Sequence, residues 1–224
     1  MINVDAKVLA QLRNLSALPA VQLESLSKNL TVKTFKKNAI VFGQSEKANL
    51  VYLLIAGVVK VSYNNRDQQT IVSMLPSGEF LALPESRHAF SCSAFETSTI
   101  GSIKPRLFVE IILGTSYANF LPGFAATLQL NRQSYVHYVR GIALDLRRRI
   151  ALELMHLADH FGEVNAHGTL ISLVLSHETL AEIVGASRQQ VTEYLNMFDR
   201  EGLILREGRR IILNSGSLRK IIET

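Results

Sequence analysis

The sequence predicts an α+β protein in which an N-terminal antiparallel β-roll of the jelly-roll type is followed by a long helix and a small C-terminal domain. Two observations predict this order. Between Leu30 and Phe108, short β-branched runs alternate with turn-forming clusters, a pattern typical of many short strands. After Pro122 the apolar residues recur with the period of a helix. We therefore expect three parts, comprising residues 1–116, 117–144 and 145–224.

The segment ahead of the roll is expected to be helical. Leu9, Leu12, Leu15 and Leu18 recur at a helical spacing before Pro19. The strand-like runs that follow are TVKTF, AIVF, LVYLLIAG, VVKVSY, TIVSML and STIGSI, with turn clusters such as KKN, GQSEKAN, NNRDQQ and LPSGE between them.

The composition excludes several classes of protein. The longest apolar run, LVYLLIAGVV, is far shorter than the ~18 residues of a membrane span. The N-terminal MINVDAKVLAQL lacks the basic and apolar regions of a secretion signal. The single cysteine, Cys92, excludes a disulfide framework and, within one chain, an iron–sulfur cluster held by cysteines. We expect a cytoplasmic protein with no membrane partner.

The net charge of +5 does not identify a nucleic-acid-binding part. The first 144 residues hold 14 Lys/Arg and 8 Asp/Glu, whereas the remainder holds 10 and 11. Only the local placement of arginines could therefore indicate where DNA binds.

The long helix carries a seam of residues at alternating spacings of three and four, as a parallel two-helix coiled coil requires. This pattern predicts a homodimer, with the polar Asn131 fixing the register. The alternative is a helix that packs on its own roll through Ala125, Val136, Val139 and Ala143. The predicted seam consists of Leu121, Phe124, Leu128, Asn131, Tyr135, Tyr138 and Ile142.

A second helix is expected directly after a hinge at Leu144-Asp145. Asp145 is a favourable N-cap, and Ile150, Leu154, Leu157 and Phe161 lie on one face of the following LRRRIALELMHLADHF. The sequence then predicts a turn at GEVNAHG and a strand at TLISLVLS.

The segment from Ser176 to Phe198 predicts a helix-turn-helix. Ser176 would cap a helix of residues 177–184, and Gly185 would supply the turn because it tolerates positive φ. Ser187 and Gln190 form a capping-box pattern for the second helix. In that helix Val191, Leu195 and Phe198 would face Leu180 and Val184 of the first.

The opposite face of the second helix carries side chains suited to DNA. Arg can hydrogen-bond to guanine, Gln and Asn to adenine, and Glu can accept from cytosine. The following LILREGRRIILN predicts a wing of two strands around a charged turn, whose arginines would lie near phosphates. The alternative is a solvated hairpin tip. The predicted DNA contacts are Ser187, Arg188, Gln189, Thr192, Glu193, Asn196, Arg206, Arg209 and Arg210.

Four stretches resemble the CRP/FNR family of dimeric bacterial transcription regulators. They are VYLLIAGVVKV with its turn at Gly57, LPSGEF, ALDLRRRIALELMHLA around Asp145, and SHETLAEIVGASRQQVTEYLNMFDREGLI. The resemblance covers nearly the whole chain. It implies an effector-sensing roll, a homodimer, and a winged helix-turn-helix whose recognition helices enter successive major grooves of palindromic double-stranded DNA. It also implies RNA polymerase as a partner.

Within the motif this resemblance assigns some roles and leaves others in doubt. Arg188 matches the family's common guanine or phosphate contact. Gln189 stands where the family often has Glu, and Glu193 where it often has Arg. We therefore expect DNA binding, but neither of the family's familiar operators.

The segment GEFLALPESRHAFSCSAF departs from the cyclic-nucleotide-binding members of the family. A second Gly-Glu is absent, the segment is about five residues shorter, and His88 falls where the phosphate-binding arginine would be. Arg87 and His88 are then candidate effector-pocket residues, with Arg87 the local candidate for a phosphate partner, and Tyr135 is a candidate effector contact on the long helix. Cyclic AMP is disfavoured; an unidentified small-molecule effector and no effector at all both stay open.

No metal site is expected, and no cofactor is established. Haem stays open because His88 and Cys92 are four residues apart and either can bind iron; the alternative is a surface histidine and a buried thiol. His156 and His160 have a metal-binding spacing but no evident third ligand.

These patterns predict a DNA-binding transcription regulator and not an enzyme. The rival is a ligand-binding jelly-roll protein, or a cupin-like enzyme, whose C-terminal module mediates protein contacts. A cupin would need His-x-His with a following Glu to hold its metal, and the sequence lacks this pattern.

Overall fold

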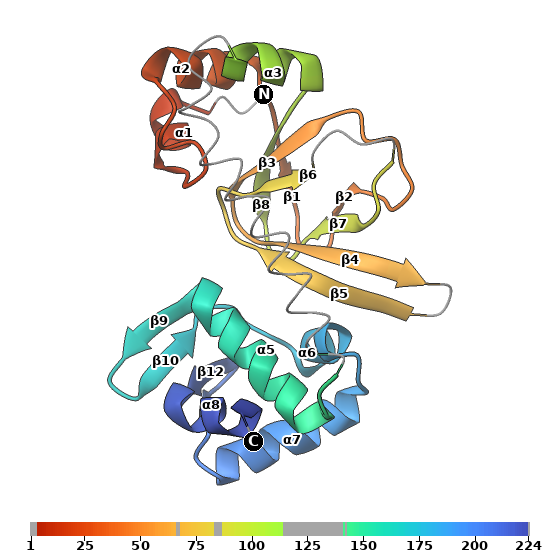
Figure 1. Ribbon diagram of the computed structural model, residues 1–224, viewed down its shortest axis with the longest axis vertical. Helices are drawn as coiled ribbons and strands as arrows, with labels where there is room; N and C mark the ends of the chain where they lie inside the picture. Colours follow the sequence, from red (N-terminus) through yellow and green to blue (C-terminus); the bar gives the residue numbers. More distant parts are fainter. Residues whose placement is uncertain (1–3, 66–67, 83–86, 114–140, 142, 224) are drawn as a thin grey trace. The chain divides into compact units, whose positions relative to one another are not determined.

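The computed structural model describes residues 4–65, 68–82, 87–113, 141 and 143–223. The chain divides into two units, Met1–Ser134 and Tyr135–Thr224. The predicted α+β class is confirmed, because antiparallel sheets dominate the described part of the first unit and helices that of the second (Figure 1). The coiled-coil seam predicted from Leu121 to Ile142 lies outside the described residues, as does Tyr135.

The first unit contains two four-stranded antiparallel sheets. One has the order β1 (Thr31–Phe35), β8 (Ser98–Ile103), β3 (Val51–Ala56) and β6 (Phe80–Ala82). The other has the order β2 (Ile40–Phe42), β7 (Ser91–Ala94), β4 (Val59–Asn65) and β5 (Gln68–Leu75). Strands distant in sequence are thus neighbours in each sheet, as in a roll.

Strand β3 is buried on both faces, which explains its uninterrupted apolar sequence. Leu54 joins the core between the two sheets, together with Phe42 and Cys92. Val51 and Leu53 join a second core, which lies under the helices. The apolar run that is too short to span a membrane therefore consists of β3, an inner strand of one sheet, followed by the turn at Gly57 and the start of β4.

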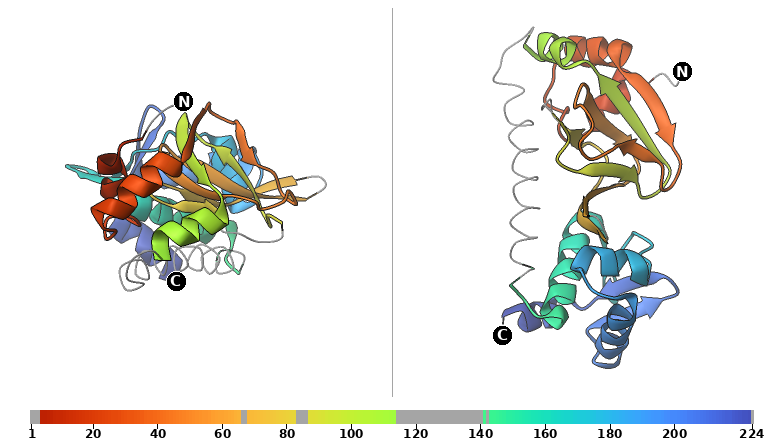
Figure 2. Two further views of the ribbon diagram at one scale, coloured as in Figure 1. Left: turned by 90° about the horizontal axis from the view of Figure 1, so that it is seen from above. Right: turned by 90° about the vertical axis from the view of Figure 1, so that its right-hand side faces the viewer.

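Three helices pack together against the second of these cores (Figure 2). They are α1 (Ala6–Gln11), α2 (Ala20–Asn29) and α3 (Pro105–Leu113). Helix α3 was not predicted, because the strand pattern was extended to Phe108; the last strand of the roll ends at Ile103 and Pro105 begins the helix.

The helix predicted from the leucine spacing before Pro19 forms only in part, as α1, and the chain becomes helical again in α2. Helix α1 ends where Leu12 becomes extended, and Leu15 and Leu18 lie in turns, although all of these leucines are buried. The buried amide of Asn14 donates to the carbonyl of Gly78 at 3.0 Å and to the Glu79 carboxylate at 3.1 Å. These long-range hydrogen bonds stabilise the turn that follows α1, where the leucine spacing predicted helix.

The second unit packs four helices around a small antiparallel sheet. The helices are α5 (Leu146–Phe161), α6 (His177–Val184), α7 (Arg188–Arg200) and α8 (Ser215–Glu223). The strand order is β11 (Ile204–Glu207), β12 (Arg210–Leu213), β10 (Gly168–Ile171) and β9 (Gly162–Asn165).

Helix α5 begins as predicted. The Asp145 carboxylate accepts from the backbone N–H of Arg148 at 3.0 Å, and the expected apolar face is buried. The segment after it differs from the prediction, since GEVN forms β9 and the next strand ends at Ile171. A hydrogen bond from the Ser172 hydroxyl to the Phe161 carbonyl, 2.9 Å, marks where β10 stops.

Candidate DNA-binding site

Helix α6 has both ends that the sequence predicts. The Ser176 hydroxyl accepts from the N–H of Thr179 at 3.0 Å, which satisfies one of the open donors of the first turn. Gly185 ends the helix in the left-handed region, with φ of 65°, and its N–H donates to the Ala181 carbonyl. The corner between the two helices is therefore set by residues local to it.

Helix α7 starts with a complete capping box. The Ser187 hydroxyl accepts from the Gln190 N–H at 3.2 Å, and the Gln190 side chain accepts from the Ser187 N–H at 3.1 Å. This reciprocal pair satisfies two backbone donors at the point where the chain re-enters helix.

The buried face of α7 fixes which residues point outward. Val191, Leu195 and Phe198 have at most 1% of their surface exposed, and they pack with the buried face of α6. Because these residues repeat at three and four positions, the polar residues between them turn away from the core. On this outer face Thr192 is half-buried, and the exposed residues are Ser187, Arg188, Gln189, Glu193 and Asn196.

Hydrogen bonds order this polar face before any DNA is present. Gln189 Nε2 donates to Glu193 Oε1 at 3.1 Å, so the two side chains that depart from the family pattern are bonded to each other. Thr192 Oγ1 donates to the Arg188 carbonyl at 2.8 Å and lies 2.8 Å from His177 Nδ1. Burial, helped by Arg206 and Arg188, holds the pKa of His177 below its usual value.

His177 also contacts this site, although no sequence pattern predicted it. The signal available was its place as the first residue of α6, directly after the cap Ser176. Its contact with Thr192 joins residues 15 apart in sequence, a pairing that becomes visible only when the two helices pack.

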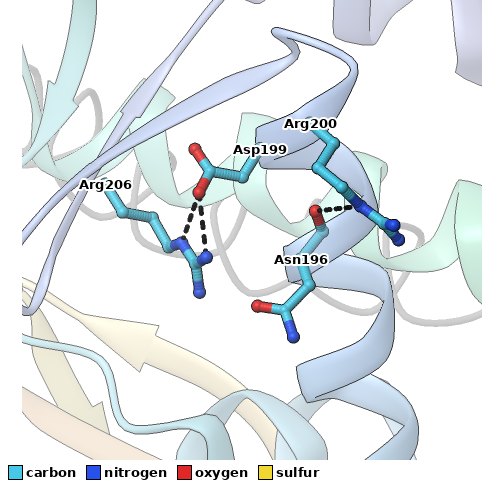
Figure 3. Close-up of polar contacts among 4 residues, drawn as sticks. All are labelled: Asn196, Asp199, Arg200 and Arg206. Carbon is cyan, nitrogen blue, oxygen red and sulfur yellow. Dashed lines mark hydrogen bonds and ion pairs between the residues drawn. The ribbon is translucent and has the colours of Figure 1, made fainter.

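The wing is confirmed as the hairpin of β11 and β12, but its turn is narrower than expected. Gly208 and Arg209 form the turn, and Arg206 lies within β11. Arg209 and Arg210 are exposed. Arg206 is bonded to Asp199 of α7 through Nε at 3.0 Å and Nη2 at 2.8 Å (Figure 3).

The Arg206–Asp199 ion pair fixes the orientation of the arginine side chain but contributes little to the stability of the domain. Both side chains are about one-third exposed, at 32% and 31%, so water screens their attraction. Figure 3 also shows Arg200, whose Nε donates to the carbonyl of Asn196 at 3.3 Å on the same helix.

Two arginines in the first turn of α5 are bonded to both helices of the motif. Arg149 donates from Nη1 to the Val184 carbonyl at 2.9 Å and from Nη2 to the Leu144 carbonyl at 3.0 Å. Arg147 donates to the Glu201 carboxylate at 2.6 Å, just after α7 ends. Arg149 thus links Leu144, at the predicted hinge, directly to Val184, the last residue of α6.

In the roll, His88 is not the surface residue that the sequence suggested. It is buried, and its ring stacks on Phe42 with centroids 4.0 Å apart. The backbone of the segment pairs with residues 45–47, and the exposed Arg87 donates from Nη1 to the Ser45 carbonyl at 2.6 Å. Of the three predicted effector-pocket residues, Arg87 and His88 therefore have intramolecular partners within the roll, and Tyr135 lies outside the described residues.

Cys92 is buried, as expected for a free thiol. Burial raises the pKa of this thiol to about 12, so the metal-free thiol is protonated at neutral pH. Among the described residues there is no cluster of three or more potential metal ligands. Over the same residues, no helix combines the length and apolarity needed to cross a membrane.

Two family models match separate parts of the chain. The cyclic nucleotide-binding domain matches residues 32–114, which cover the roll. The Crp-like helix-turn-helix domain matches residues 148–221, which cover α5 to α8.

Relatives match across both parts. A CRP-like cAMP-activated global transcriptional regulator of Mycobacterium tuberculosis is 25% identical over 198 residues, covering 86% of this chain and 88% of the relative. The nitrogen fixation regulation protein FixK of Azorhizobium caulinodans is 27% identical over 208 residues, with coverages of 90% and 82%. A mutant of CooA from Carboxydothermus hydrogenoformans shares the fold with a TM-score of 0.77 at 24% identity, covering 87% of this chain and 88% of that one.

The roll, the capped helix-turn-helix and these matches define a DNA-binding transcription regulator with a cyclic nucleotide-binding-type domain. The chain belongs to the CRP/FNR family. The rival interpretation, a jelly-roll ligand-binding protein or cupin-like enzyme, is not favoured, because the relatives are transcription regulators.

Proposed function

We propose that the protein is a homodimer that binds a palindromic duplex, with α7 of each protomer in one of two successive major grooves. The observation that carries this proposal is the exposed polar face of α7, held outward by the capping box and by the buried residues opposite. An α-helix fits the major groove, where every base pair presents a distinct pattern of donors and acceptors. The two-fold symmetry places half-site centres one helical turn apart.

Within this interface we assign base reading to α7 and phosphate binding mainly to the wing. Arg188, at the first position of α7, is exposed and suited to a guanine edge. Gln189 and Glu193 would act as one unit because they are bonded to each other. Thr192 and Asn196 complete the reading face, and Ser187 can bond a phosphate from the start of the helix. The exposed Arg209 and Arg210 would bind phosphates, with Arg206 beside them.

We infer that the roll binds a small effector other than cyclic AMP, or none. The match to the cyclic nucleotide-binding domain supports a sensing role for residues 32–114. Against a cyclic nucleotide, the expected phosphate-binding arginine is replaced by His88, which is stacked under Phe42. Arg87, the remaining local cation, donates to Ser45.

The proposed route of control runs through the start of α5. Arg149 bonds the Leu144 carbonyl beside the predicted hinge and also the last carbonyl of α6, so displacement at the hinge would move the helix-turn-helix. An effector can shift this equilibrium only by binding one arrangement better than the other. The protein would act in the cytoplasm by binding, not by catalysis, and would act on RNA polymerase at promoters.

The test is selection from random duplex DNA with purified, ligand-free protein at fixed salt, followed by affinity measurements. A palindromic motif whose affinity falls log-linearly with salt is expected. Arg188→Ala should weaken binding by about 1–3 kcal/mol and relax the preference at one base pair. Arg219→Ala, which removes an exposed arginine of α8, is the matched control. Failure to bind DNA at any salt would refute the proposal.

A further inference from the structure

His177 occupies a junction between the two helices of the motif. It is the first residue of α6, it is half-buried, and its Nδ1 lies 2.8 Å from Thr192 Oγ1 on the outer face of α7. Beyond this contact, His177 has no role in the proposed base and phosphate contacts.

The hydrogen bonds around Thr192 determine which ring nitrogen carries the proton. A threonine hydroxyl has one hydrogen, and that of Thr192 is donated to the Arg188 carbonyl at 2.8 Å. Thr192 Oγ1 must then accept from His177, so the N–H lies on Nδ1. In the neutral ring Nε2 consequently has a lone pair and acts only as an acceptor.

The charges facing His177 favour this neutral form in the free protein. Arg206 of β11 and Arg188 of α7 both act on the ring, and Asp199 partly compensates Arg206 through their ion pair. On its own helix the acidic residue of the first turn is Glu178. Burial is the largest cause of the lowered pKa of His177, followed by these two arginines.

We propose that DNA binding is coupled to the uptake of a proton by His177 in each protomer. The inference rests on the proposed placement of α7. In such complexes the first helix crosses the phosphate backbone while the start of the second meets the bases. His177 begins the first helix and is bonded to the second, beside two arginines that would approach the same anionic strand.

A phosphate reverses the balance that keeps the ring neutral. A phosphate oxygen is an acceptor, as is the neutral Nε2, so the two cannot share a hydrogen bond. Once Nε2 is protonated it donates a charge-assisted bond while Nδ1 keeps its bond to Thr192. Phosphate and proton therefore bind more tightly together than either does alone.

This coupling has a defined sign. If the DNA complex holds an additional proton, affinity rises as the pH falls through the window between the bound pKa and the lower free-protein pKa. The limiting slope is about tenfold in Kd per pH unit for each protomer that contacts DNA.

The experiment measures Kd for the duplex recovered by the selection, from about pH 5.5 to about pH 8.5 at constant salt. His177→Asn keeps an amide N–H close to the position of Nδ1 but cannot take up a proton. His177→Arg carries a permanent charge. His167→Asn, in the exposed turn between β9 and β10, is the control for a histidine of the same domain outside the junction.

The wild type and the His167→Asn variant should bind more tightly as the pH falls, whereas His177→Asn and His177→Arg should lose most of that dependence. Calorimetry of the wild type in buffers of different ionisation enthalpy should show proton uptake on binding, a result that needs no variant to fold.

Three outcomes separate the hypotheses. Specific binding by the wild type with the same pH slope as His177→Asn, or without proton uptake, would overturn this inference and leave the proposed function intact. Affinity that rises with pH only when His177 is present would also overturn it, because the neutral Nε2 would then accept from a base. Absence of DNA binding by the folded wild type would instead refute the proposed function.

Discussion

The helix-turn-helix and the segment of the roll around His88 follow the family pattern to different degrees. In the helix-turn-helix, Ser176, Gly185 and Ser187 each have the local role that their sequence positions indicate. In the roll, His88 stands where a phosphate-binding arginine was expected and is buried against Phe42. Local signals therefore define the geometry of the helix-turn-helix, whereas contacts between distant strands define the segment around His88.

Two glycines with positive φ allow the strongest test of this contrast. At Gly57 in the roll, with φ of 93°, an added Cβ would lie 2.5 Å from Ser98 Oγ and 2.8 Å from both Ser98 Cα and the Thr97 carbonyl oxygen. At Gly185, with φ of 65°, the nearest atom would be 3.9 Å away. Gly57→Ala should therefore cost more than about 3 kcal/mol of unfolding free energy, and Gly185→Ala only about 1 kcal/mol.

Hydrogen exchange read by mass spectrometry measures both effects in the full chain, because each unit gives its own peptides. Gly202→Ala is the control: its φ is 68° and it has no atom within 4 Å of an added Cβ, so it should resemble Gly185→Ala. Equal losses of unfolding free energy in Gly57→Ala and Gly185→Ala would show that backbone strain alone governs both turns.

Arg149 tests whether the second unit also depends on long-range bonds. Its two bonds to main-chain carbonyls are partly buried, so Arg149→Gln should cost about 2 kcal/mol and should weaken DNA binding. The Arg147–Glu201 pair has side chains 40% exposed, and Arg147→Gln should change stability by less than about 1 kcal/mol. Urea unfolding, followed by circular dichroism, measures the loss of unfolding free energy in each of the two variants. Arg147→Gln as the more damaging change would disprove the assigned role of Arg149.

The capping box tests the local half of the comparison. Ser187→Ala leaves the Gln190 N–H without its acceptor and should destabilise the start of α7 by about 1 kcal/mol. Ser187→Gly should cost less, because glycine is tolerated at this position. Hydrogen exchange at the first turn of α7 is the measurement, and protection unchanged in Ser187→Ala would mean that packing alone holds the turn.

The smallest expected effects are opposite responses of the two units to acid. Burial lowers the pKa of His177, so the second unit should lose stability as the pH falls through the usual histidine value of 6.5. Burial raises the pKa of Glu79 despite its hydrogen bond from Asn14. The contribution of protonated Glu79 to the stability of the first unit is therefore fully present below the usual pKa of 4.5, and it is lost as the pH rises through the higher pKa of the folded state.

Variants whose side chains do not titrate identify which residue causes each change of stability with pH. His177→Asn should flatten the acid response of the second unit, and Glu79→Gln that of the first, when exchange rates of each are followed with pH. If the stability of both units changed with pH in the same direction, the assignment of these effects to His177 and Glu79 would be contradicted.

Elements with local signals could be predicted from the amino-acid sequence. Asp145, Ser176, Ser187 and Gly185 bond within three or four residues of their own positions, so the start of α5, both ends of α6 and the start of α7 could be predicted from spacing alone. Alternation of β-branched runs with turn residues likewise predicted the roll, because each strand is short and separately bounded.

Features that join residues distant in sequence could not be predicted before the elements were seen packed together. The Asn14 amide replaces helix by turn through bonds to Gly78 and Glu79, and His88 is buried because Phe42 lies against it. The Arg206–Asp199 and His177–Thr192 contacts form when β11 and α6 pack on α7. The physical reason is that a cap needs only its neighbours along the chain, whereas burial and partner choice depend on which other elements arrive beside a residue.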